Sequence, residues 1–86
     1  MQDHKLIYEA KKLPQRPGVY FYKNEDGKVL YIGKALSLRD RVTSYFQNDI
    51  SSKTVELLHH ADSISYIETG SEFEALLLEA RLIKLY

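Results

Sequence analysis

Apolar and polar residues alternate in two short segments of the chain, residues 18–23 and 29–34, with Asp26-Gly27 between them. A period of two is typical of β-strands, and an Asp-Gly pair between two such runs is a strong signal for a hairpin turn. We therefore predict an antiparallel hairpin over residues 18–34.

The register of this hairpin follows from its turn, because short even-numbered loops centred on Asp26-Gly27 give the same pairing. It places Tyr20 opposite Gly33 and Tyr22 opposite Tyr31 on one face. The core face would consist of Val19, Phe21, Leu30 and Ile32. We expect Gly33 to leave a notch beside the Tyr20 hydroxyl. The alternative is that tyrosine is simply a good strand residue and that Gly33 marks a bulge.

Helical periodicity is present over residues 5–13, 37–46, 52–61 and from 71 onward, while residues 63–69 alternate like a third strand. Ser37 with Asp40, and Ser71 with Glu74, have the spacing of capping boxes at helix starts. The inward positions of the first two helices are expected to be Leu6, Ile7, Ala10, Leu38, Val42, Tyr45 and Phe46. This order of elements predicts an α+β domain in which a small three-stranded antiparallel sheet is flanked by helices.

The size and composition fit a single small domain, because 86 residues can enclose one core but not two. There is no cysteine, which excludes disulfides and thiolate metal sites and favours a reducing, cytoplasmic location. The longest apolar run, residues 75–78, is far too short to cross a membrane, and the first residues do not resemble a signal peptide. Since the helical pattern continues to Tyr86 without a cap, we interpret the chain as a fragment of a longer protein.

The formal net charge is zero, which is not the strongly basic composition of a protein that holds nucleic acid by itself. Any affinity for DNA must therefore come from a local group of cations or from other domains and partners.

Glu79 is the anomaly of the last helix, because it lies between Ala75 and Ile83 inside an apolar arc of about two-thirds of the helical wheel. The other charges of this helix lie on the opposite side: Glu74, Arg81 and Lys84. A buried carboxylate requires a cation, since its desolvation is otherwise unfavourable.

That cation could be an arginine such as Arg41, a lysine, or a divalent metal. A single carboxylate suits Mg²⁺ or Mn²⁺, which retain several waters, better than Zn²⁺. The three histidines, His4, His59 and His60, are expected at the surface and not as ligands.

Several sequence segments together resemble a known family. The strings GVY at 18–20 and YIG at 31–33 are similar to the paired motif of GIY-YIG endonucleases. The similarity extends through LPQRPGVY, YIGKA, RVTSYF and SEFEALLLEARLIK, and from about Leu13 onward the chain resembles the N-terminal endonuclease domains of the UvrC family of the ABC excinuclease.

The resemblance implies a GIY-YIG fold and a hydrolytic DNA endonuclease that uses one divalent metal ion, Mg²⁺ or Mn²⁺. It implies incision of a damaged duplex on the 3′ side of the lesion, after the damage-bound helicase of the excinuclease has been loaded. It assigns the metal to Glu79 and further site roles to Tyr20, Tyr31, Lys34, Arg41 and Tyr45.

In that assignment Tyr20 accepts the proton of the attacking water, Tyr31 hydrogen-bonds water or phosphate, and Lys34 and Arg41 bind phosphate oxygens. Helical periodicity alone does not choose between Arg39 and Arg41, which flank the apolar stripe on opposite sides. The chain also departs from the family pattern at Arg81, where relatives often have asparagine.

Two other functional classes remain open from the sequence. One is a non-catalytic DNA-docking or subunit-interaction module on the same scaffold. The other is an ordinary α+β domain in which Glu79 forms a buried ion pair with Arg41.

Overall fold

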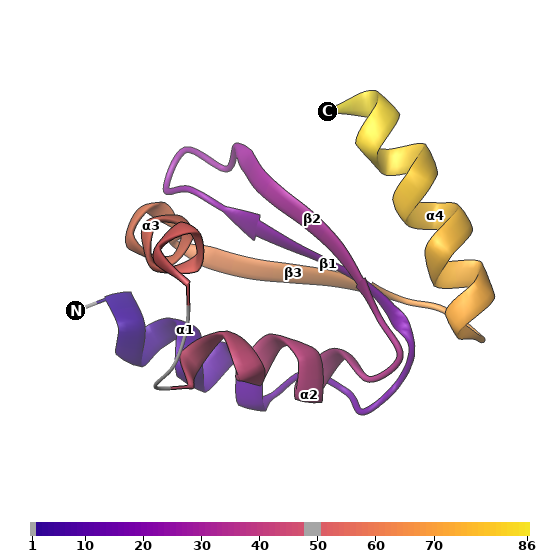
Figure 1. Ribbon diagram of the computed structural model, residues 1–86, viewed down its shortest axis with the longest axis horizontal. Coiled ribbons are helices and arrows are strands. Elements are labelled where there is room, and N and C mark those ends of the chain that lie inside the picture. The colour runs from indigo at the N-terminus through magenta and orange to yellow at the C-terminus, as the bar shows by residue number, and fades with distance from the viewer. Residues whose placement is uncertain (1, 48–50) are drawn as a thin grey trace.

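The computed structural model describes residues 2–47 and 51–86 and confirms the expected α+β architecture (Figure 1). The elements are α1 (Gln2–Lys11), β1 (Gly18–Lys23), β2 (Val29–Ala35), α2 (Leu38–Thr43), the 3₁₀ turn η1 (Ser44–Phe46), α3 (Ser52–His60), β3 (Ser63–Glu68) and α4 (Glu72–Leu85). The predicted helix over 37–46 is divided, because its second half tightens into η1. None of the described helices is both long and apolar enough to span a bilayer.

The three strands form an antiparallel sheet in the order β2-β1-β3, so β1 is central. The predicted pairs Tyr20 with Gly33 and Tyr22 with Tyr31 are both present. The register shifts after Tyr22, where Lys23 pairs with Val29. Because of this irregularity Leu30 does not lie on the predicted face and packs against the cluster that contains Tyr22.

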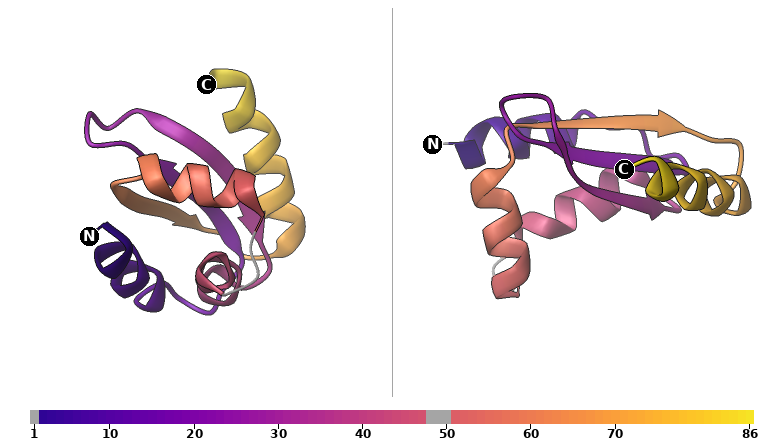
Figure 2. Two further views of the ribbon diagram at one scale, coloured as in Figure 1. Left: turned by 60° about the vertical axis from the view of Figure 1, so that its left-hand side comes forward. Right: turned by 90° about the horizontal axis from the view of Figure 1, so that it is seen from above.

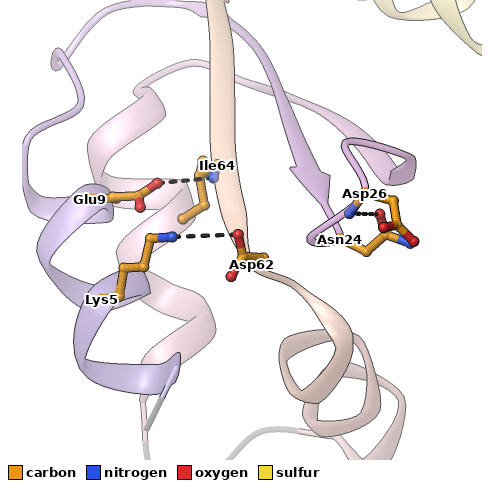
Figure 3. Close-up of polar contacts among 6 residues, drawn as sticks. All are labelled: Lys5, Glu9, Asn24, Asp26, Asp62 and Ile64. Atoms are coloured by element: carbon orange, nitrogen blue, oxygen red, sulfur yellow. Dashed lines mark hydrogen bonds and ion pairs between the residues drawn. The ribbon is translucent and has the colours of Figure 1, made fainter.

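Local hydrogen bonds hold the ends of the elements. Ser37 and Ser71 are N-caps, and their hydroxyls accept from the backbone N–H of Asp40 (3.5 Å) and Glu74 (3.1 Å). In the hairpin turn, the side chain of Asn24 accepts from the backbone N–H of Asp26 at 3.0 Å (Figure 3).

Two polar contacts connect α1 to the strand β3 and the segment just before it (Figure 3). The ammonium of Lys5 lies 3.4 Å from a carboxylate oxygen of Asp62, and the backbone N–H of Ile64 donates to Glu9 at 3.1 Å. These two contacts hold the N-terminal helix α1 against the edge strand β3.

The sheet is covered on both faces, which the sequence did not predict. We call one face the tyrosine face; its core cluster combines β1 with α1, α2, η1 and α3 and contains Leu6, Ala10, Leu13, Tyr20, Tyr22, Ala35, Leu38, Val42, Tyr45, Leu58 and Ala61. We call the other the aliphatic face; Val19, Phe21 and Ile32 there pack against Ala75 of α4. Figure 1 shows α4 apart from the other three helices, and the left view of Figure 2 shows α3 in front of the strands.

The assignment of the core to one face was therefore wrong. Tyr20 and Tyr22 are 1% and 0% exposed, because three helices pack on the face that was not assigned to the core. Val19, Phe21 and Ile32 are buried as predicted, but in the smaller of two clusters.

The apolar arc of α4 is mostly exposed, and this corrects the predicted environment of Glu79. Ala75 is the buried residue of the helix, Leu78 and Leu82 are half-buried, and the large apolar residues that are exposed are Phe73, Leu76, Leu77, Ile83 and Leu85. Glu79 is half-buried and not enclosed. The helical wheel overstated its burial because α4 contacts β1 and β2 through a narrow strip.

Candidate active site

A hydrogen bond between two buried tyrosines lies at the centre of the tyrosine face. Tyr20 comes from the central strand β1 and Tyr45 from η1, and their hydroxyl oxygens are 2.7 Å apart. Val42 of α2 is fully buried, and the turn that follows it directs Tyr45 toward the sheet. Either hydroxyl can donate this bond, so the pair can accept one further hydrogen bond and donate another.

Gly33 lies beneath the ring of Tyr20 and does not leave an open notch. A Cβ atom at position 33 would lie 2.5 Å from Cζ of Tyr20 and would also collide with its hydroxyl. The predicted notch is thus filled by the tyrosine itself. Glycine is needed at this position because the ring crosses the backbone of β2.

Tyr22 and Tyr31 complete a cluster of four aromatic rings. The ring of Tyr22 is 5.1 Å from that of Tyr45, and the ring of Tyr31 is 6.2 Å from that of Tyr20. Tyr31 is 41% exposed and forms the outer part of the cluster, whereas the buried hydroxyl of Tyr22 has no hydrogen-bond partner among the described residues. Tyr22 is two residues after Tyr20 on the same strand and therefore lies on the same face. This spacing could have indicated Tyr22 as a member of the aromatic cluster.

The structure distinguishes the two arginines of α2. The guanidinium carbon of Arg41 lies 5.3 Å from the ring centroid of Tyr45, on the side of the aromatic cluster. The Nε of Arg39 instead donates to the backbone carbonyl of Leu13 at 2.8 Å and so holds the end of the α1 segment. Arg41 is therefore the arginine that lies at the tyrosines, and it is exposed enough to meet a ligand.

Burial controls the protonation of these tyrosines. It raises the pKa of Tyr20 above its ordinary value, and this effect outweighs the lowering by the interactions with Tyr45 and Arg41. Burial likewise raises the pKa values of Tyr22 and Tyr45, while the interaction with Tyr20 raises the pKa of Arg41. At neutral pH the three buried tyrosines are neutral phenols and Arg41 is a cation. Arg41 does lower the pKa of Tyr20, but by less than burial raises it.

A cleft of about 380 Å³ opens beside the cluster. Its walls come from β2, α2, η1 and the start of α3, and its lining residues are Leu30, Tyr31, Arg41, Ser44, Tyr45, Ser51, Lys53, Thr54 and Leu57. Lys53 was not among the predicted site residues, because its place in this cleft depends on how α3 packs in the fold.

Lys34 lies in a second hollow of about 500 Å³, which adjoins the cleft through the shared residues Arg41 and Ser44. This hollow also contains the carboxylates of Asp40 and Glu72. The structure thus brings Tyr20, Tyr31, Arg41 and Tyr45 together, whereas Lys34 lines the adjoining hollow and not the cleft.

Glu79 is positioned by α4, which packs on β1 and β2. Within residues 2–47 and 51–86 its carboxylate forms no hydrogen bond or ion pair, and it does not line the cleft. The predicted alternative of an ion pair with Arg41 is therefore not observed in the described part of the chain. The same part contains no group of three His, Cys, Asp or Glu side chains that could hold a metal.

A half-buried carboxylate that is not engaged elsewhere fits a hard cation such as Mg²⁺, which takes one or two protein oxygens and completes its shell with water. His59 and His60 are exposed, as expected, and the side chain of His4 lies outside the described residues.

Crystal structures of a related domain have the same fold. The chain superposes on the GIY-YIG N-terminal endonuclease domain of UvrC from Thermotoga maritima, bound to magnesium, with a TM-score of 0.87 and 40% identity, covering 95% of this chain and 90% of that domain. Point variants of the same domain, in which one tyrosine is replaced by phenylalanine, are also described as bound to the catalytic divalent cation.

Curated sequences give the same result. The chain is 44% identical over 80 residues to the UvrABC system protein C of Methanothermobacter thermautotrophicus, and 55% identical over 75 residues to that of Nitratidesulfovibrio vulgaris. These alignments cover 93% and 84% of this chain but only 14% and 11% of the relatives. Residues 16–86 match the profile of the UvrC-like GIY-YIG domain. The chain therefore belongs to the family of UvrC-like GIY-YIG domains.

Proposed function

We propose that this chain is a metal-dependent DNA endonuclease domain that hydrolyses one phosphodiester of a damaged strand. The observation that carries the proposal is the Tyr20–Tyr45 hydrogen bond, which lies beneath Arg41 at the edge of an open cleft. A buried pair of phenols beside an exposed cation is suited to an anion and the water that attacks it. The relatives named as UvrABC system protein C support DNA excision repair as the setting.

Each residue of the cluster has a role in this proposal. Arg41 presents a planar fork of donors to two phosphate oxygens, and Lys34 supplies a second positive charge from the adjoining hollow. The exposed hydroxyl of Tyr31 binds water or phosphate.

Tyr20 accepts a hydrogen bond from the attacking water and shares its own proton with Tyr45. Because burial raises its pKa, Tyr20 can act as a base only after added positive charge favours the phenolate.

Glu79 is the proposed ligand of the divalent ion, Mg²⁺ or alternatively Mn²⁺. When bound, the ion supplies a Lewis acid for a phosphate oxygen. The Thermotoga maritima domain remains bound to its cation in each of the tyrosine-to-phenylalanine variants, which supports a carboxylate and not a tyrosine hydroxyl as the principal protein ligand.

Two finer features are also proposed. We expect the incision to fall on the 3′ side of the lesion, and we expect the domain to act after the helicase of the excinuclease has bound the damage. Contacts with that helicase would involve regions outside this chain, which spans about an eighth of its curated relatives.

A non-catalytic docking module is the second candidate, and the exposed apolar residues of α4 favour it, because such residues often mark protein contacts. The two candidates differ in what they require of Glu79. A docking module does not need its carboxylate.

The experiment is nicking of a lesion-containing duplex in Mg²⁺ by the wild-type chain and by Glu79→Gln, with Glu25→Gln in the exposed hairpin turn as the matched control. The proposal predicts that Glu79→Gln loses both cutting and Mn²⁺ binding, measured by electron paramagnetic resonance, while its melting temperature stays close to wild type. Cutting by Glu79→Gln at the wild-type rate would contradict the metal assignment and favour a different site.

A further inference from the structure

The cleft beside Arg41 has a feature that the proposed chemistry does not use. Two of its lining residues are cations, Arg41 and Lys53, and none of its lining residues in the described part of the chain is a carboxylate. Neither cation forms an ion pair within residues 2–47 and 51–86. In a protein with zero net charge, such a cleft is a local region of positive potential that favours an anion.

The two adjoining hollows differ in this respect. The hollow that contains Lys34 also contains Asp40 and Glu72, so its charges compensate one another. Arg41 and Ser44 line both hollows and therefore lie at the boundary between them. A DNA strand whose reacting phosphate is held at Arg41 would place its neighbouring phosphate in one of the two, and the cleft with Lys53 is electrostatically the better one.

The other lining residues fit the remainder of a nucleotide. Leu30 and Leu57 supply apolar surface, and the 41%-exposed ring of Tyr31 can stack on a sugar or base. The hydroxyls of Ser51 and Thr54 lie beside Lys53 in the same wall. A volume of about 380 Å³ is at the small end of the range of about 300–1,000 Å³ that is typical for ligand sites.

We propose that Lys53 binds a second phosphate of the DNA strand, adjacent to the phosphate that Arg41 holds, and so sets the position of the strand in the site. This inference rests on the proposed function for the identity of the ligand. Lys53 is a positioning residue: it contacts the substrate away from the bond that breaks.

The first test is the salt dependence of DNA binding without metal, measured by fluorescence anisotropy with a short duplex in EDTA. Loss of one phosphate contact to duplex DNA lowers the slope of log Kd against log salt by about 0.9. We expect this change for Lys53→Gln and for Arg41→Gln. The matched control is Lys11→Gln, an exposed lysine of α1 that lines neither hollow, and its slope should equal that of the wild type. Equal slopes for Lys53→Gln and Lys11→Gln would overturn the inference.

The second test identifies which phosphate is bound. Single phosphates of the duplex are replaced in turn by neutral methylphosphonates. A variant that already lacks the contact to one phosphate loses no further affinity when that phosphate is neutralised. The contacted phosphate is therefore the one whose replacement makes wild type and variant bind equally. We expect different, neighbouring phosphates for Arg41→Gln and Lys53→Gln. The same phosphate for both variants would show that the cleft holds no separate site, and the inference would then be wrong although the nuclease proposal stands. Failure of the wild type to cut, with two phosphates still mapped, would refute the nuclease proposal and leave the strand-binding site.

Discussion

The two faces of the sheet bury different kinds of side chain. The tyrosine face buries phenolic hydroxyls beneath three helices, whereas the aliphatic face packs Val19, Phe21 and Ile32 against α4 alone. A core that needed only stability would resemble the aliphatic face, because each buried hydroxyl must recover the hydrogen bonds that it loses to water. The tyrosine face instead retains Tyr22 without a partner in the described residues and places Arg41 at its margin. The proposed function accounts for these polar groups on the tyrosine face, whereas packing alone accounts for the aliphatic face.

Phe21→Ala should produce the largest change in the free energy of unfolding, because it removes a buried ring from the aliphatic face. We expect a loss of about 3–5 kcal/mol, measured by denaturant unfolding. Phe73→Ala on α4 is the matched control, since that ring is 66% exposed, and it should change stability by less than about 0.5 kcal/mol. Equal losses for the two variants would mean that the aliphatic face is not a packed core.

Gly33→Ala should destabilise by about 1–3 kcal/mol, because the added methyl group forces the ring of Tyr20 to move. The displaced hydroxyl should also slow DNA cutting. A double-mutant cycle with Tyr20→Ala tests the cause: in that background the effect of Gly33→Ala should largely disappear. A full effect in the absence of the ring would indicate that position 33 requires glycine for another reason.

Stability should fall at alkaline pH through the buried tyrosines. Their pKa values in the folded protein are raised by burial, while in the unfolded chain they ionise near pH 10. Below about pH 10 both states are protonated and stability is unaffected; above it the unfolded state alone loses protons, so unfolding becomes more favourable. Above about pH 10, each tyrosine that stays protonated only in the folded protein lowers the free energy of unfolding by about 1.4 kcal/mol per pH unit.

The free energy of unfolding is measured from about pH 9 to about pH 11.5, because a phenol with an ordinary pKa of about 10 ionises in this range. Tyr22→Phe should give a shallower slope than the wild type, and Tyr8→Phe, at a 62%-exposed position, should not. A slope that is independent of Tyr22 would contradict the burial of its ionisable hydroxyl.

The smallest expected effect is the difference in stability between two variants that each lose one hydroxyl group on the tyrosine face. Tyr45→Phe breaks the 2.7 Å bond and leaves Tyr20 without its partner, which should reduce stability by about 1 kcal/mol. Tyr22→Phe removes a hydroxyl without a partner in the described residues and should be neutral or slightly stabilising. A comparable loss for both variants would indicate that Tyr22 has a hydrogen-bond partner, such as a bound water.

Much of the fold could be predicted from local signals. The period of two, the Asp26-Gly27 turn and the capping serines gave the strands, the register up to Tyr22 and the starts of two helices. The division of the core between two faces could not be predicted, because tyrosine suits both a buried and an exposed strand face. It is decided by helices that lie far away in the sequence.

The candidate site shows the same limit. Periodicity did not separate Arg41 from Arg39; their different contacts depend on where α1 ends against α2. The wheel of α4 placed Glu79 inside an apolar arc but assumed that the whole arc is covered, which it is not. Lys53 had no local signal, since its place in the cleft depends on how α3 packs in the fold.

The proposal on which the others depend is that the carboxylate of Glu79 holds a divalent ion. Anomalous diffraction from a crystal of this chain soaked in Mn²⁺ tests it most directly. We predict a single strong anomalous peak at Glu79 that disappears in Glu79→Gln. A peak elsewhere, or a Glu79 side chain bonded to a guanidinium with no manganese beside it, would contradict the claim.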